Sequence, residues 1–476
     1  MTRQMHLAAH FPGVDNTTVW ADPPSRRPTT TPAGCASRSP SIGSQIDFSS
    51  FVHLARTAER GLFDFLFLAE GLRLREHKGR IHDLDVAGRP ESLTVLGALA
   101  AVTEHLGLAA AVNATFNEPY ELARRFASLD HLSGGRAAWN VVTSFDAFTG
   151  ENFRRGGSLD RADLPQDLGF ARSGGTPITR AAEFVATARE LWDSWTPEGT
   201  PRPFAHQGQH FSIAGEFTVP RSPQGHPVVI QAGESGESRE FAASTADIVF
   251  TGWGSGGHPP GGHSTRHGTL EGGREFYADV KSRLAKYGRR PEDLKIMPGV
   301  TFVLGDTDAE AQEKAADIRR RQVSPQNAIV ALEQIWGRDL SAYDPDGPLP
   351  EIDPDPDSEP VKGRVKGGDP FAVAARWRAL SEAKGLSIRQ TVIETTGRQS
   401  FIGTPASVAA RLTEFVTADA ADGFILVPHL TPGGLDDFVD RVVPLLQERG
   451  VFRTEYSGPT LRSHLGLPTP YGRLNT

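Results

Sequence analysis

The chain has little of what would stabilise it by covalent cross-links or hold it in a membrane. Among its 476 residues there is a single cysteine, Cys35. One cysteine excludes an internal disulfide and a cysteine-based metal site, and it fits a reducing compartment. No apolar run is long enough for a signal peptide or a membrane span. We therefore expect a cytoplasmic protein that does not associate with a membrane.

An excess of one charge sign is also missing. The chain has 50 Lys and Arg against 58 Asp and Glu, a formal net charge of −8, and the two signs are interspersed. This distribution predicts no nucleic-acid partner. What the chain does have is 38% hydrophobic residues, enough for a large core, together with 50 glycines and 35 prolines. Many tight turns and some long loops are expected.

Short apolar segments alternate with amphipathic helical patterns, which predicts a parallel α/β sheet. The eight predicted strands are Met5–Phe11, Phe65–Ala69, Gly107–Val112, Ala137–Thr143, Pro227–Ala232, Asp247–Thr251, Leu294–Leu304 and Gly423–Val427. Nine helices are predicted at Phe48–Arg60, Ser92–His105, Tyr120–Leu132, Ile178–Trp195, Ser238–Ala246, Leu270–Tyr287, Ala309–Gln322, Pro405–Thr417 and Leu435–Glu448. Eight strands, each followed by a helix, favour a (β/α)8 TIM barrel, although a doubly wound sheet could also hold eight strands.

A TIM barrel typically needs about 250 residues, so much of this chain must lie in insertions or extensions. We predict one domain, 1–476, with insertions at about 155–176, 251–269 and 324–385 and a carboxyl-terminal extension at 449–476. The second insertion is interpreted as a loop that excludes water from the site. The third contains YDPDGPLPEIDPDPDSEP, whose Pro and Asp content predicts an exposed excursion without helix or central strand.

Polar residues follow the ends of most predicted strands. In a TIM barrel the loops after the strands share one face and carry the chemistry. At any single position a polar residue can simply mark the end of a strand, but the recurrence favours a binding face. The candidates for contact with a substrate on this face are His10, Trp20, Asn113, Phe116 and Trp253.

The sharpest local pattern is PVVIQAGESGESREFAA, residues 227–243, in which an apolar strand runs through a glycine-rich turn into a helix. The amino terminus of a helix binds phosphate through its free backbone N–H groups and its dipole. Gly233 and Gly236 allow close approach, Ser235 can donate its hydroxyl and Arg239 can add charge. The alternative is a tight turn with capping serines and no ligand.

Other catalytic patterns are lacking. There is no G-x-S-x-G nucleophile turn. Asp353, Asp355 and Asp357 imitate the start of a calcium loop, but Ser358 replaces the required glycine. We predict no metal site. A chain without an evident set of catalytic acids and bases suits chemistry carried by a bound cofactor.

The stretch SLDHLSGGRAAWNVVTS, residues 128–144, resembles the fourth-strand signature of the bacterial luciferase-like flavin monooxygenases. The resemblance is to the branch that includes the nitrilotriacetate, EDTA and dibenzothiophene-sulfone monooxygenases. Similar blocks include FVHLARTAERGLFDFLFLAEGL, RAAEFVATARELWDSW and GLDDFVDRVVPLLQERGVFRTEYSGPTLRSHLGL. They cover most of the chain and weaken in the Asp/Pro segment and around 156–176.

The resemblance implies a TIM barrel with insertions and a two-component reaction. Reduced FMN (FMNH2) would come from a separate NAD(P)H:flavin reductase and react with O2 to a C4a-peroxyflavin. That species would oxygenate a small organic substrate, in some members with cleavage of a C–N or C–S bond. The resemblance also implies a homo-oligomer, a dimer or tetramer, and we interpret the tail RTEYSGPTLRSHLGL as suited to packing against a partner subunit.

The resemblance also assigns flavin contacts. The FMN phosphate would lie at Ser235 and the neighbouring backbone, Thr115 would match a contact after the third strand, and Asn140 would lie near the isoalloxazine ring. Glu70 stands where the family usually has Asp. A family His and Tyr that contact FMN are replaced by Gly174 and Ile178.

Two alternatives stay open. One is an F420-dependent hydride-transfer enzyme of the same superfamily. The other is a barrel without catalysis that serves as a binding protein, which the missing His and Tyr would favour. The flavin that the protein binds distinguishes them.

Overall fold

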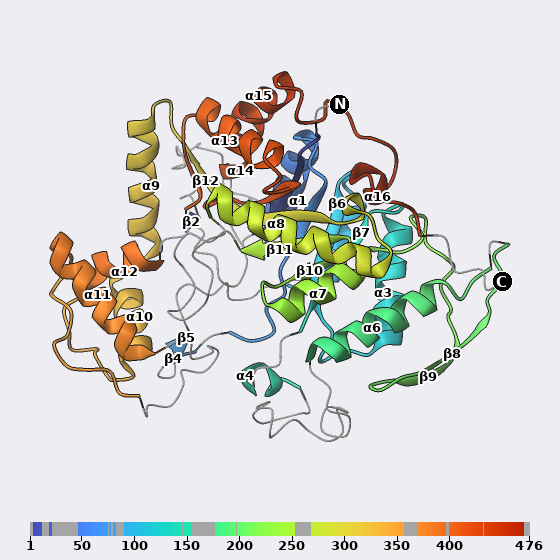
Figure 1. Ribbon diagram of the computed structural model, residues 1–476, viewed down its shortest axis with the longest axis horizontal. Helices are drawn as coiled ribbons and strands as arrows, with labels where there is room; N and C mark the ends of the chain where they lie inside the picture. Colours follow the sequence, from blue (N-terminus) through green and yellow to red (C-terminus); the bar gives the residue numbers. More distant parts are fainter. Residues whose placement is uncertain are drawn as a thin grey trace, which may run out of the picture.

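The computed structural model describes residues 3–11, 19–20, 46–74, 76–77, 80–81, 90–143, 147–153, 177–196, 198–252, 268–356, 369–396, 399–431 and 433–470. Eight of its strands form a closed parallel barrel, in the order β11-β10-β7-β6-β3-β1-β14-β12, with β12 pairing back onto β11 (Figure 1). They are β1 (His6–His10), β3 (Phe65–Leu68), β6 (Gly107–Asn113), β7 (Ala137–Val142), β10 (Val228–Ala232), β11 (Ile248–Gly252), β12 (Lys295–Leu304) and β14 (Gly423–Val427). The predicted TIM barrel and its eight strands are confirmed.

The barrel has two apolar layers because successive side chains of a strand point to opposite faces. On β6, Ala109 and Ala111 face the interior, where they meet residues such as Phe65 and Phe67 of β3. The alternate residues Leu108 and Ala110 pack outward against the surrounding helices. Small residues on some strands make room for the aromatic rings of others.

The helices around the barrel follow the amphipathic patterns of the sequence. The structure has α1 (Phe48–Arg60), α2 (Ser92–Ala100), α3 (Pro119–Leu132), α4 (Ala147–Gly150), α6 (Pro177–Trp192), α7 (Gly236–Thr245), α8 (Leu270–Leu284), α9 (Asp308–Gln322), α13 (Pro405–Thr417), α14 (Gly434–Arg441) and α15 (Val443–Glu448). The predicted helix Leu435–Glu448 is divided at Val442, because Pro444 cannot continue a hydrogen-bonded helix and instead lies in the first turn of α15.

The segment predicted as the third insertion contains helices that the sequence analysis did not predict. These are α10 (Pro325–Trp336) and α11 (Pro370–Lys384), followed by α12 (Ile388–Thr396) just beyond it. They share a separate hydrophobic cluster around Trp336 and Trp377, and they lie beside the end of α9 at the left of Figure 1. The described part of the Asp/Pro segment has no helix or strand, as predicted. The segment was also predicted to be an exposed excursion, but it contacts α11, because Arg378 donates to the carbonyls of Pro350 and Ile352.

Short strands complete the described chain. A hairpin of β8 (Pro203–Gln207) and β9 (Ser212–Glu216) projects from the barrel at the right of Figure 1. A pair of β4 (Glu76–His77) and β5 (Arg80–Ile81) follows β3, and β13 (Phe401–Gly403) extends the sheet beside β12. The last pair, β2 (Val19–Trp20) with β15 (Leu430–Thr431), joins the segments that follow β1 and β14.

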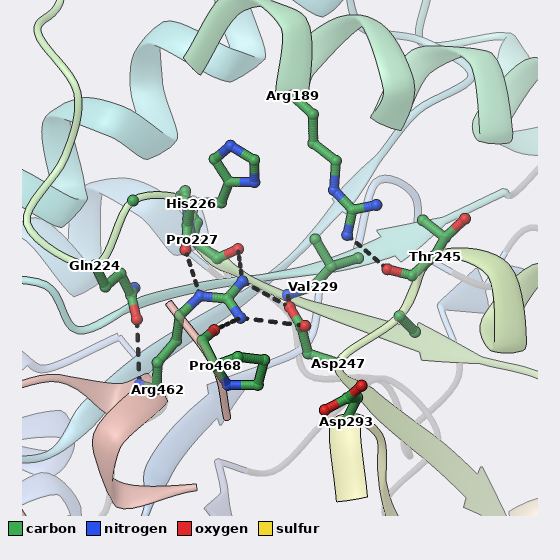
Figure 2. A network of polar contacts seen from close by, with 12 residues as sticks. Arg189, Gln224, His226, Pro227, Val229, Thr245, Asp247, Asp293, Arg462 and Pro468 are labelled. Carbon is green, nitrogen blue, oxygen red and sulfur yellow. Dashed lines mark hydrogen bonds and ion pairs between the residues drawn. The ribbon is translucent and has the colours of Figure 1, made fainter. Parts of the chain in front are cut away.

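The carboxyl-terminal tail closes the barrel at the amino-terminal ends of its strands. Leu461 of α16 (Leu461–His464) and Leu465, which directly follows this helix, are fully buried among the interior residues. Leu461 N donates to Gly135 O just before β7. Arg462 reaches Asp247, which immediately precedes β11 (Figure 2). The interpretation of this tail as a partner-binding surface is wrong for its apolar side chains, because they lie inside the chain's own barrel. The homo-oligomer itself stays a prediction.

Candidate active site

The carboxyl-terminal ends of the eight parallel strands meet at one face, opposite to the face that α16 closes. At this face His10 of β1 is buried, and its ring centroid lies 5.0 Å from that of Phe67 on β3. Phe67 in turn lies 5.7 Å from Phe250 on β11. The three rings line the barrel interior below the loops. They give the site an apolar floor, with one polar edge at His10.

Glu70 lies two residues after β3 and is half-buried. Burial raises the pKa of its carboxyl to about 8, and the neighbouring Glu91 adds to this rise, although the backbone N–H of Asn113 donates to the carboxylate and opposes it. A carboxyl with this pKa is mainly protonated at neutral pH. Glu70 is therefore a hydrogen-bond donor at the mouth of the barrel, a property that its sequence position did not indicate.

Asn113 ends β6 and organises the turn that follows it. Its side-chain oxygen accepts from the backbone N–H groups of Thr115, at 2.6 Å, and Phe116, at 3.1 Å. Asn113 and Thr115 are both buried, whereas Phe116 is half-buried and stacks on Phe153, with centroids 4.4 Å apart. The side-chain oxygen of Asn113 thus fixes the shape of this turn, and its contact with a substrate stays a prediction.

Asn140 of β7 is buried, and its side-chain oxygen has no hydrogen-bond partner among the described residues. Alternation along β7 places it on the same side as Ala138, which lies in the barrel interior. A buried amide oxygen without a donor costs about 1–3 kcal/mol. Its position inside the barrel, close to the mouth, fits a group that receives a hydrogen bond from a bound molecule.

The turn between β10 and α7 has the geometry of an anion site. Ser235 is the N-cap of α7, and its side-chain oxygen accepts from Ser238 N at 3.1 Å. Ser235 and Gly236 are exposed at the first turn, where backbone N–H groups have no partner within the helix. Gly233 has φ +141°, and a Cβ there would lie 2.7 Å from Ser238, so only glycine fits.

Arg239 holds its guanidinium between this turn and α8. Its guanidinium donates to Glu234 O and to the carboxylate of Asp279 on α8, 3.0 and 2.7 Å away. The charge that the sequence analysis offered to a phosphate is thus neutralised by Asp279. Any phosphate at α7 would depend on the helix amino terminus and on Ser235.

The loops after β3 and β7 are tied together at the site's rim. Arg73 pairs with Glu151 at 2.7 Å and donates to the side-chain oxygen of Asn152, which itself donates to Leu72 O. Together with the stack of Phe116 on Phe153, these contacts build one wall of the mouth from three loops. Its residues Leu72 and Arg73 closely follow Glu70 in the chain.

Two buried residues after the eighth strand were missed, His429 and Thr431. Their sequence signal is the same as for the other candidates, since both polar residues follow the predicted strand Gly423–Val427 in VPHLT. Some of the predicted residues cannot be placed: Trp253, Gly174 and residues 253–267 lie outside the described residues, as does the side chain of Trp20. Ile178 packs against the hydrophobic core.

Two classes of site find no support in the described part of the chain. It contains no group of three or more His, Cys, Asp or Glu side chains arranged to hold a metal ion. No helix within it has the length and apolar character needed to cross a bilayer.

Comparisons with known proteins agree with this arrangement. Residues 29–423 match the model of the family described as luciferase-like monooxygenase. The chain is 39% identical to an N-acetyl-S-(2-succino)cysteine monooxygenase of Bacillus subtilis, over 89% of this chain and 90% of that protein. It is also 39% identical to nitrilotriacetate monooxygenase component A of Aminobacter aminovorans, over 89% and 91%.

Among solved structures, a riboflavin lyase with modified FMN and riboflavin has a TM-score of 0.70 at 27% identity, covering 98% of this chain and 97% of that one. The barrel fold and the polar residues at its carboxyl-terminal face agree with the family to which these relatives belong. The chain belongs to the luciferase-like monooxygenase family and is a flavin-dependent monooxygenase.

Proposed function

We propose that the chain is the oxygenating component of a two-component system, uses FMNH2 delivered by a separate NAD(P)H:flavin reductase, and inserts one atom of O2 into a small organic molecule. The name "component A" of the nitrilotriacetate relative supports the division into two components. The FMN in the riboflavin lyase structure supports FMN as the flavin. Because the two relatives at 39% identity are named monooxygenases, hydride transfer with F420 is the weaker alternative.

The observation that carries the proposal is the turn between β10 and α7 at the mouth of the barrel. Ser235 and Gly236 present the helix amino terminus outward, and Gly233 has no side chain to block it. This arrangement fits the FMN phosphate. At the interior end of the same face, the free oxygen of Asn140 fits an N–H donor such as that of an isoalloxazine ring, with Thr115 and Glu70 as further contacts.

The bound reduced flavin would supply the activation of O2. The chain's own part is to bind the flavin, orient the substrate and exclude water. The floor of Phe67 and Phe250 keeps the interior dry. Glu70 holds a proton on its carboxyl at neutral pH and can donate a hydrogen bond at the mouth.

The substrate is proposed as a small organic molecule, and cleavage of a C–N or C–S bond fits the names of the relatives. The two relatives act on a thioether and on an amine with carboxylate groups, by their names. The described mouth of this chain has both aromatic and polar walls, which fits a substrate with an apolar body and a few hydrogen-bonding atoms.

The test is a titration of the purified protein with FMN and, without oxygen, with FMNH2 and with reduced F420. We expect preference for FMNH2, followed by oxygen consumption when a flavin reductase and NADH are added. Binding of F420 alone would replace the proposal with hydride transfer. Binding of no flavin would favour the third interpretation, a barrel with a binding role.

A further inference from the structure

The segment after β14 carries polar atoms that the proposed flavin site does not use. His429 and Thr431 follow the eighth barrel strand, so they lie at the same face as Asn140 and Glu70. Their exposed fractions are only 6% and 4%. Thr431 belongs to β15, whose backbone pairs with Trp20 of β2, the segment that follows β1. His429 and Thr431 are therefore held between the loop that follows the first barrel strand and the loop that follows the last.

The protonation of His429 follows from its surroundings. Its Nδ1 lies 3.0 Å from the side-chain nitrogen of Gln322, the last residue of α9. An amide nitrogen can only donate, so Nδ1 accepts and the ring proton is on Nε2. Burial lowers the pKa of His429 to about 4, so the ring is neutral at pH 7. His429 thus offers one N–H donor in a fixed orientation.

This donor is not used within the described chain. Nε2 of His429 has no hydrogen-bond partner among the described residues, and neither has Oγ1 of Thr431 two residues later. A buried donor without an acceptor costs about 1–3 kcal/mol, and proteins rarely keep two such groups together. His429 and Thr431 can therefore bind an acceptor that the described residues do not supply.

The electrostatic surroundings restrict that acceptor. Burial alone lowers the pKa of His429; no carboxylate or cation contributes to the shift. A carboxylate ligand would enter a buried place where no cation of the described residues acts on His429 to balance the charge, at a cost of several kcal/mol. An uncharged oxygen needs only the two donors that the site has.

We propose that Nε2–H of His429 and the hydroxyl of Thr431 bind an uncharged acceptor oxygen of the organic substrate, such as that of a sulfone or an amide. Gln322 is a positioning residue, because it fixes which ring nitrogen carries the proton. The inference rests on the proposed function and deepens it: it favours neutral oxo-substrates over polycarboxylates at this end of the site.

Nuclear magnetic resonance of the full chain labelled with ¹⁵N-histidine tests the inference. The signals of His429 are identified by their loss in His429→Gln. We expect a neutral ring protonated at Nε2, and a saturable shift of that signal on addition of diphenyl sulfone. Nitrilotriacetate, a carboxylate probe of similar size, should cause no shift. A saturable shift with nitrilotriacetate, or none with the sulfone, would overturn the inference.

A matched pair of variants gives a second measurement. Thr431→Val keeps the shape of a buried β-branched residue and removes the hydroxyl, so the dissociation constant of the sulfone should rise about tenfold. Thr187→Val is the control, since Thr187 is equally buried but bonds within α6. Equal effects of the two variants would contradict the assignment. A parallel titration with FMNH2 distinguishes the two proposals. If the protein binds the sulfone at His429 but binds no flavin, the proposed function is refuted and the substrate subsite is not.

Discussion

Arg462 and Asp247 form a two-pronged ion pair between residues 215 positions apart in the chain, with nitrogen–oxygen distances of 2.9 and 3.2 Å. Both are buried, and Asp247 Oδ2 also accepts from Val229 N of β10 at 2.8 Å. Burial alone would raise the pKa of Asp247, but Arg462 and Arg189 hold it below its usual value. The contact fastens the tail to the base of the barrel (Figure 2).

Two further aspartates at the amino-terminal ends of the barrel strands make the same combination of an ion pair and a hydrogen bond. Asp64 precedes β3 and accepts from Leu7 N of β1, and it pairs with Arg453 of the tail. Asp422 precedes β14, accepts from Ile296 N of β12 and pairs with Arg3 at the other end of the chain. In each case an aspartate before one strand holds the neighbouring strand and a residue from near a chain end.

Replacing Arg462 with Met should lower the free energy of unfolding by about 3 kcal/mol, because Asp247 would stay buried without its partner. Urea unfolding followed by circular dichroism measures the effect. Arg124→Met is the control, since Arg124 pairs with Glu121 on the exposed surface of α3 and such pairs contribute less than about 1 kcal/mol. Equal midpoints for the two variants would show that the tail does not stabilise the barrel.

Glu70→Gln should change how stability depends on pH. Folded Glu70 keeps its proton up to a pH of about 8, whereas the unfolded side chain releases it near 4.5, so the free energy of unfolding falls as pH rises between these values. Gln cannot ionise, so the variant should match the parent at pH 4 and exceed it by about 4 kcal/mol at pH 8. Unfolding of the flavin-free protein at several pH values tests this. A curve for Glu70→Gln that runs parallel to that of the parent would refute the buried proton.

Ser235→Ala should weaken FMN but not riboflavin, because only FMN carries the phosphate that the first turn of α7 would hold. A lost hydrogen bond to a charged group is worth about 1.5–3 kcal/mol, so the dissociation constant for FMN should rise about tenfold or more. Fluorescence titration with both ligands measures this. Ser244→Ala, at the other end of α7, serves as control. An equal loss of both ligands would place the phosphate elsewhere.

Gly233→Ala should reduce both stability and FMN affinity. The backbone there has φ +141°, and the new Cβ would lie 2.7 Å from Ser238, so the turn must shift at a cost of about 1–3 kcal/mol. Thermal unfolding and FMN titration report the two effects. Gly97→Ala in α2 meets no atom within 4 Å and should keep or raise the stability by about 0.5–1 kcal/mol. A harmless Gly233→Ala would show that the turn tolerates another conformation.

Local patterns were enough to predict the barrel. Each strand is a short apolar run, and capping residues set the helix starts: α13 begins after Thr404, whose hydroxyl accepts from Ser407 N, as its sequence indicates. The β10–α7 turn could be predicted for the same reason, since glycines and serines act within a few residues of themselves. The helices α10 and α11 were missed because the Asp/Pro segment between them dominated the pattern, whereas packing of Trp336 against Trp377 stabilises them.

The sequence by itself determined the order of strands and helices, the family and the glycine-rich turn, because each depends on neighbours in the chain or on a recognisable motif. Only the tertiary structure decided the state of single groups. The proton on Glu70 comes from burial beside β6. The proton on Nε2 of His429 follows from the hydrogen bond that Gln322, 107 residues away, donates to Nδ1. The place of Arg462 inside the barrel base comes from Asp247. Burial and long-range contacts set these properties, and neither is visible in the order of residues.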